Sequence, residues 1–212
     1  MFDAEVIAID PEDEYRRLCE AVRGQYIEFS FGSKSKINPF DLPRPVTGQE
    51  VSAEDIIRSA VIALKGLLKI MIGPFTTEED AIIDRGLLEC YAKKDITPAT
   101  DLSTLTPESM PLLQDLAQIL DGMVGGTKLG DRLKKFTEGT FAGLLNAPTN
   151  VATRNQLVVF SVRDLEDELK PIAIYSIVNY IWNVVRSERK KRVLVVDEAW
   201  WLMQQEDSAK FI

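Results

Sequence analysis

Runs of apolar residues predict four β-strands along this chain. The last run, Val193 to Val196, has no polar alternation, which is typical of a strand buried on both faces of a parallel sheet. It leads directly into Asp197 and Glu198, and the first run likewise ends in Asp10. The predicted strands cover residues 5–10, 26–30, 157–162 and 193–196.

Apolar residues at helical spacing predict helices between these strands. Pro11 starts the first helix and Gly24 ends it. Residues 52–55 have the sequence of a capping box at the start of the second helix, and residues 106–108 start the fourth. The predicted helices cover approximately residues 11–23, 52–72, 77–94, 106–121, 130–137 and 170–186.

The order of these elements predicts an α/β fold with an all-α helical insertion. Strand, helix and strand over residues 157–196 have the length of a right-handed βαβ unit, so we expect their two strands to be parallel. We predict that residues 1–48 form the first part of the α/β core and residues 49–145 the all-α insertion. Residues 146–212 then form the second part of the core.

Composition narrows the chemistry that this fold can carry. The chain has no histidine, which excludes imidazole-based catalysis and nearly all catalytic zinc sites. Its 33 acidic residues outnumber its 25 Lys and Arg, which weighs against binding of nucleic acid over the whole surface. Cys19 and Cys90 lack metal-site spacing and are expected to be reduced thiols of a cytosolic protein. The longest apolar stretch, residues 56–75, contains three cations and is a poor membrane span.

Asp197 and Glu198 are the strongest candidates for chemistry. Ligands of open α/β sheets bind at the carboxyl ends of the strands, where these two residues are expected. The pattern resembles the Walker B element of P-loop nucleotidases, in which the first carboxylate faces Mg²⁺ and the next polarises the attacking water. The alternative is an acidic strand end that caps the following helix.

Three further segments each allow a functional and a structural interpretation. Asp10 could contact a nucleotide site from the neighbouring strand, or it could cap the first helix. Residues 187–192 are strongly basic and could contact DNA phosphate, but such a run is more typical of a solvated helix end. Residues 32–35 superficially match the end of a phosphate-binding loop, and we reject that match because the upstream glycine is missing and Pro39 follows.

Three motifs in this order resemble the traffic ATPases of conjugation and type IV secretion. They are Ile9-Asp10-Pro11-Glu12-Asp13-Glu14-Tyr15, Ile37-Asn38-Pro39-Phe40-Asp41-Leu42, and Val195-Val196-Asp197-Glu198-Ala199-Trp200 with Leu202-Met203. The sequence is similar to the VirB-four class (TraC- and TraE-like), in the FtsK–HerA branch of RecA-like motors. The similarity extends over nearly the whole chain.

The resemblance implies a RecA-like parallel sheet core with a helical insertion, using ATP and Mg²⁺. It implies that Asp197 is the metal-side carboxylate, that Glu198 is catalytic, and that Asp10 and Glu14 belong to a nucleotide-site motif. It also implies a hexameric ATPase at the inner face of the cell membrane that energises substrate transfer and pilus assembly. The partners would be other type IV secretion subunits, including a coupling protein and inner-membrane components. DNA would be a further partner, although the acidic charge balance does not support it.

The chain departs from the family in one respect, because it contains no Gly-x-x-x-x-Gly-Lys-Ser/Thr sequence. We therefore expect an internal fragment that does not hydrolyse ATP alone, with its phosphate loop upstream and its glutamine sensor and arginine finger downstream. Two other functions stay open. One is a DNA-translocating motor of the FtsK–HerA kind, and the other is a non-enzymatic interaction module with a vestigial Asp197-Glu198 pair. A Mg²⁺ nuclease using Asp10 and Asp197 is a remote alternative.

Overall fold

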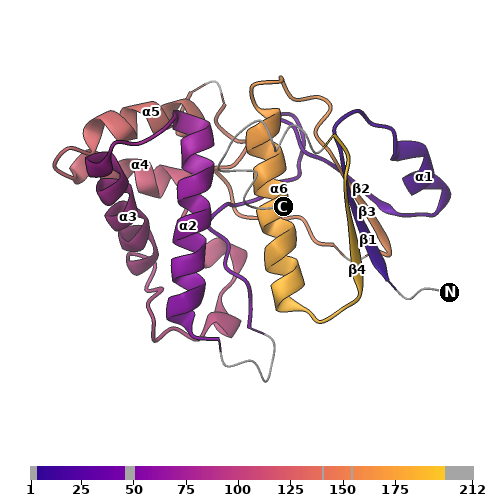
Figure 1. Ribbon diagram of the computed structural model, residues 1–212, viewed down its shortest axis with the longest axis horizontal. Coiled ribbons are helices and arrows are strands. Elements are labelled where there is room, and N and C mark those ends of the chain that lie inside the picture. The colour runs from indigo at the N-terminus through magenta and orange to yellow at the C-terminus, as the bar shows by residue number, and fades with distance from the viewer. Residues whose placement is uncertain (1–3, 46–50, 140, 154, 199–212) are drawn as a thin grey trace.

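The computed structural model describes residues 4–45, 51–139, 141–153 and 155–198 of the chain. Within them, four parallel strands form one sheet in the order β2-β3-β1-β4 (Figure 1). The prediction of an α/β fold with parallel strands is therefore confirmed. The strands are β1 (Glu5–Asp10), β2 (Gln25–Glu28), β3 (Leu157–Ser161) and β4 (Arg192–Val196).

The two faces of the sheet are covered by different helices. α1 (Arg16–Ala21) lies on one face, where its Cys19 packs with Ala8 and Val159. α6 (Lys170–Ser187) lies on the other face, toward which the alternate residues Ile7, Ile9, Val158 and Phe160 point (Figure 1). This alternation follows from the two-residue period of a strand.

The prediction that β4 is buried on both faces is wrong. Val193 is 50% exposed and Leu194 is 41% exposed, although the two residues point to opposite faces. β4 pairs only with β1 and so forms an edge of the described sheet. An apolar run gains burial only when neighbouring elements cover it, and this run has fewer neighbours than the central strands.

Local end signals determine the two longest helices of the helical block. α2 (Ala53–Ile72) starts where Ser52 Oγ accepts the N–H of Asp55 at 3.1 Å, and it ends at Gly73, whose φ is +86°. α3 (Thr77–Ala92) starts with a reciprocal capping box between Thr76 and Glu79. Both helices lie within about two residues of their predicted positions. Figure 1 shows α2 side by side with α6.

The rest of the block contains two short 3-10 helices, η1 (Leu102–Thr104) and η2 (Pro107–Ser109), and the helices α4 (Leu113–Gly122) and α5 (Thr127–Thr137). The prediction that a helix begins at Thr106 is wrong, because α4 begins only at Leu113. Met110 is extended, with ψ 145°, as the residue before a proline tends to be. Pro111 therefore separates the 3-10 turn from α4.

The first helix is also shorter than predicted. α1 begins at Arg16 rather than at Pro11, and Asp13 takes the left-handed conformation with φ +64°. A residue in that conformation interrupts a right-handed helix. Leu18 and Val22, which share the helical spacing of Cys19, are 52% and 55% exposed.

The segment Ile37–Leu42 joins the helical block to α6. Ile37 and Phe40 are fully buried, and the Tyr91 hydroxyl of α3 donates to the Phe40 carbonyl at 3.0 Å. Asn38 Nδ2 donates to the Pro111 carbonyl at 2.8 Å, and Asn183 Nδ2 of α6 donates to the Asp41 carbonyl at 2.9 Å. The second sequence motif is thus hydrogen bonded to α3, to the segment at Pro111 and to α6, and it connects these parts of the core.

Other predictions are confirmed, lie outside the described residues, or stay predictions. Cys19 and Cys90 are free and buried. A search of the described residues finds no helix that is both long and apolar enough to cross a membrane. Ala199, Trp200 and Leu202-Met203 of the third motif lie outside the described residues. The boundaries at residues 48 and 145 stay predictions.

Candidate functional site

The carboxyl ends of the strands bring the predicted site residues to one edge of the sheet. Asp10 of β1 is in register with Ser161 of β3, and Ile9 is in register with Val196 of β4. The N–H of Asp197 donates to the Ile9 carbonyl at 3.1 Å and so extends this pairing by one residue. Asp10 and Asp197 therefore end adjacent strands, as the parallel arrangement requires.

Asp197 and Glu198 form a tight turn at the end of β4. The N–H of Glu198 donates to Asp197 Oδ1 at 2.9 Å, and Glu198 has φ +50°. A non-glycine residue in the left-handed region costs about 1–2 kcal/mol, and such strain clusters at functional sites. The turn leaves both carboxylates half-buried. After Asp197 the backbone therefore turns away from the direction of β4.

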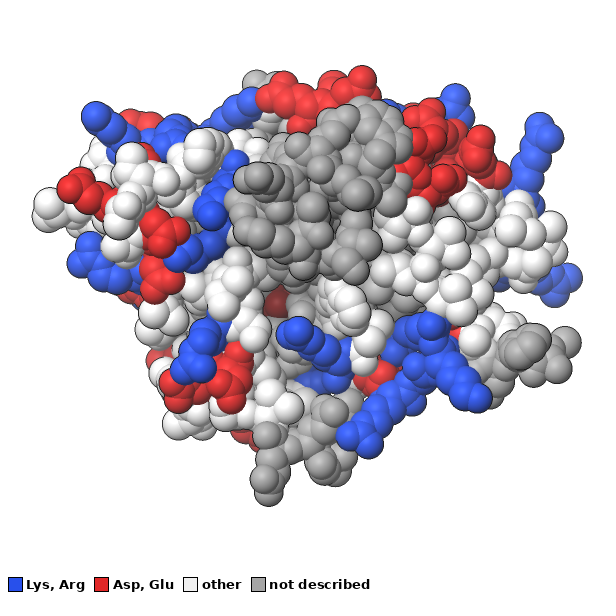
Figure 2. Space-filling model, in the orientation of Figure 1, with Lys and Arg blue, Asp and Glu red and all other residues white. Residues whose placement is uncertain are grey.

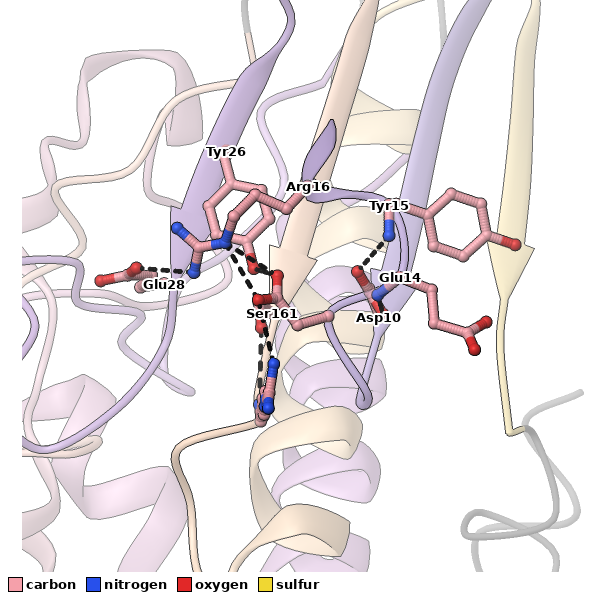
Figure 3. A network of polar contacts seen from close by, with 9 residues as sticks. Asp10, Glu14, Tyr15, Arg16, Tyr26, Glu28 and Ser161 are labelled. Carbon is pink, nitrogen blue, oxygen red and sulfur yellow. Dashed lines mark hydrogen bonds and ion pairs between the residues drawn. The ribbon is translucent and has the colours of Figure 1, made fainter. Parts of the chain in front are cut away.

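Asp10 has a structural task at the same edge. Its carboxyl is fully buried and accepts the N–H groups of Glu14 at 3.0 Å and Tyr15 at 2.9 Å. Figure 3 shows both main-chain nitrogens directed at Asp10, while the exposed side chain of Glu14 points away from it. These bonds hold the turn before α1, but they are not the predicted helix cap, because the N-cap of α1 is Tyr15 and no side chain caps it. Nucleotide contacts by Asp10 and Glu14 stay predictions.

A cluster around Asp13 was not predicted from the sequence. Both Asp13 oxygens lie 3.0 Å from Arg16 Nε, Arg163 Nη1 lies 3.3 Å from Oδ2, and the Tyr26 hydroxyl donates to Oδ1 (Figure 3). Arg16 also pairs with Glu28 at 3.1 Å and lies 4.3 Å from the centre of the Tyr26 ring. The cluster therefore fixes the turn after β1 against β2 and against the loop after β3.

The electrostatics of this cluster follow from its contacts. The Tyr26 hydroxyl and the Arg16 guanidinium hold the pKa of Asp13 below its ordinary value. Burial and the Asp13 carboxylate raise the pKa of Tyr26 to about 12. Asp13 is thus a permanent anion and Tyr26 a neutral donor at neutral pH. Only the three-residue spacing from Asp13 to Arg16 could have indicated part of this cluster.

The donor set at the edge fits a magnesium ion that is only partly held by protein. The described residues contain no group of three or more His, Cys, Asp or Glu side chains arranged to hold a metal. Mg²⁺ usually binds through one or two carboxylates, completing its shell with water and substrate phosphate oxygens. Asp197 could supply such a carboxylate. The arrangement does not fit an ion caged entirely by these side chains.

A solved structure, "Structure of VirB4 of Thermoanaerobacter pseudethanolicus", is similar to this chain. The similarity covers 98% of this chain and 79% of that chain, with a TM-score of 0.85 and 28% sequence identity. No family model and no curated protein match the sequence. The structural match confirms the resemblance to the VirB-four class that the three motifs indicated.

Proposed function

We propose, from the similarity of this chain to the solved VirB4 structure, that Asp197 and Glu198 form the magnesium side of an ATP-hydrolysing site. The observation that carries this proposal is the position of the pair. It forms a strained turn at the carboxyl end of β4, hydrogen bonded to the central strand β1. Nucleotides bind at this edge in open parallel sheets.

The two carboxylates are suited to different tasks. Asp197 would hold Mg²⁺, which when bound neutralises charge on the phosphates of ATP. Glu198 follows in a left-handed turn, so its carboxylate leaves the strand in another direction and can accept a hydrogen bond from the attacking water. Asp10 would support the site indirectly, because its buried carboxyl fixes the adjoining turn.

A nucleotide site of this kind binds the phosphates through main-chain N–H groups and a lysine of a glycine-rich loop. This sequence contains no such loop. We therefore expect weak or no ATP binding by these 212 residues alone. A longer version from the same gene that includes a Gly-x-x-x-x-Gly-Lys-Ser/Thr sequence should bind and hydrolyse Mg²⁺-ATP.

The test is calorimetry with Mg²⁺-ATP on both versions, followed by ATP turnover on the longer one. Glu198→Gln should lower turnover by about 100-fold or more while ATP binding remains, because only the water-polarising group is lost. Asp197→Asn should weaken binding in Mg²⁺ but not in EDTA. Glu20→Gln, an exposed change on α1, is the matched control and should leave both unchanged. Turnover at the wild-type rate by Glu198→Gln contradicts the proposed roles.

In the cell, we propose that the complete protein is a homo-oligomer that works with other type IV secretion subunits at the inner face of the membrane. These would include a coupling protein and inner-membrane components, and the work would be substrate transfer and pilus assembly. If neither version binds nucleotide, the interaction-module function replaces this proposal. DNA-stimulated turnover would instead favour a DNA-translocating motor.

A further inference from the structure

A cavity of about 470 Å³ lies between the start of α2, the end of α6 and the Pro43–Pro45 segment. Three arginines line it, Arg44, Arg186 and Arg189, and the Arg44 guanidinium also donates to the Leu105 carbonyl at 3.0 Å. The apolar side chains of Val51, Ile56 and Val185 complete its walls. Cations and apolar groups thus share one concave surface, far from the acidic edge where the strands end.

The charge of this cavity is opposite to that of the chain. The chain has a formal net charge of −8, yet Asp55 is the acidic residue among the described lining residues. Asp55 is already paired with Arg58 at 3.1 Å. Arg186 and Arg189 are exposed, and neither forms an ion pair with another described residue. Figure 2 shows one group of Lys and Arg side chains at the lower middle and right of this face and one group of Asp and Glu side chains at the top, with both kinds mixed on the left.

A second cavity of about 360 Å³ continues the first along α2 and α6. The two cavities share Pro43, Ile56, Ser59 and Arg186. The second exposes two large apolar side chains, Ile62 at 61% and Trp182 at 42%. We call the two cavities together the α2–α6 groove. Its length along two helices suits an extended chain better than a compact small molecule.

We propose that the α2–α6 groove binds an extended segment of a partner protein in which acidic and apolar residues alternate. Its carboxylates would contact Arg186 and Arg189 in charge-assisted hydrogen bonds, and its apolar side chains would lie against Ile56 and Trp182. Nucleic acids and anionic membranes carry extended negative charge, which the net charge of −8 of this chain repels, whereas a short segment contacts only the local arginines. The groove therefore favours a peptide.

This binding does not depend on the proposed ATP site. The 18-residue helix α6 runs from near the carboxyl edge to the groove, and such a helix is about 27 Å long. The two sites therefore lie at opposite ends of α6, and loss of one should leave the other intact.

The experiment uses this chain and a fluorescein-labelled peptide of four Leu-Glu repeats, measured by fluorescence anisotropy without nucleotide. The wild type should bind it more tightly than a peptide of four Ser-Glu repeats and should not bind four Leu-Lys repeats. The double variant Arg186→Glu/Arg189→Glu should bind the Leu-Glu peptide at least about tenfold more weakly, because two charge-assisted contacts become repulsive. The double variant Arg186→Lys/Arg189→Lys should retain most of the binding.

Arg17→Glu is the matched control, since Arg17 is an exposed arginine on α1 and lies outside the groove. It should bind the Leu-Glu peptide as the wild type does. Unchanged thermal unfolding of each variant shows that folding is intact. The proposal is overturned if the Leu-Glu peptide does not bind, or if the charge-reversed variant binds it equally well. Equal binding of the Ser-Glu peptide overturns it too, because the apolar walls then add nothing. Equal binding of single-stranded oligothymidine or of vesicles of phosphatidylglycerol also overturns it, because the groove then does not select a peptide.

Discussion

Gly66 should be the position at which the contact between α2 and α6 tolerates least change. A Cβ atom at Gly66 would collide with the hydroxyl of Tyr175 on α6. That hydroxyl is buried and donates to the Ala63 carbonyl at 2.9 Å, one turn earlier on α2. The substitution Gly66→Ala therefore forces Tyr175 to move and breaks this hydrogen bond.

The magnitude follows from three contributions. Alanine in the interior of a helix is about 1 kcal/mol more favourable than glycine. Overpacking of a dense core costs about 1–3 kcal/mol. Loss of a buried hydrogen bond costs about 1–2 kcal/mol more. The expected net result is a decrease of about 1–4 kcal/mol in the free energy of unfolding.

The same substitution in a Tyr175→Phe variant tests this reasoning. In Tyr175→Phe the hydroxyl is absent, and the nearest atom to the new Cβ would be the ring carbon Cζ at 3.2 Å, which a small shift relieves. Gly66→Ala should then cost less than about 1 kcal/mol, or should stabilise the protein through helix propensity.

Urea unfolding followed by circular dichroism measures all four proteins of this double-mutant cycle. Gly122→Ala is the control, because a Cβ atom at Gly122 meets nothing within 4 Å and the substitution should not destabilise the protein. Equal costs of Gly66→Ala in the two backgrounds, or stabilisation in the Tyr175 background, would refute the reasoning.

Three further predictions concern buried polar groups. Burial raises the pKa of Asp41 to about 6, above its ordinary value of 3.8, so its ionisation destabilises the fold as the pH rises through that interval. Asp41→Asn should therefore gain about 2 kcal/mol relative to the wild type between pH 4.5 and pH 7.5 in urea unfolding, and a pH-independent difference would contradict this. Asp10→Ala should lower the free energy of unfolding by about 2–4 kcal/mol, because two N–H groups lose their acceptor, and an unchanged urea midpoint would show that these two hydrogen bonds are dispensable. Burial raises the pKa of Cys19 and raises that of Cys90 to about 12, so Ellman's reagent should react with both thiols only in denaturant, and rapid reaction of the native protein would contradict their burial.

Elements with local end signals could be predicted from the sequence, and those that depend on distant contacts could not. α2 and α3 carry their caps next to their first turns, so their positions followed from a few residues. The start of α4 was predicted wrongly, although the sequence contains the signal for it, because Pro111 disfavours helix at Met110. The start of α1 was not, since it depends on the Asp10 side chain capturing two N–H groups. The exposure of β4 depends on its place at the sheet edge, which its own apolar residues do not encode.

Part of the candidate site could likewise be predicted from the sequence, and part could not. Asp10 and Asp197 end adjacent parallel strands, and the rule for carboxyl ends of strands was sufficient to predict that they meet. The Asp13 cluster includes Arg163, which is 150 positions away in the sequence, so no local pattern could indicate it. The α2–α6 groove likewise joins Arg44, Ile56 and Arg186 from three separate segments.

β1 occupies the middle of the sheet, yet both of its neighbours come late in the chain. β1 ends at Asp10, whereas β3 begins at Leu157 and β4 at Arg192. At about 5–20 residues per second, a ribosome needs roughly 7–30 s to make the intervening chain. α2 to α5 rely on contacts closer in sequence and can form during that time. Synthesis therefore favours an order in which the helices fold first and the sheet closes last, and the apolar β1 is the segment that a chaperone would need to shield meanwhile.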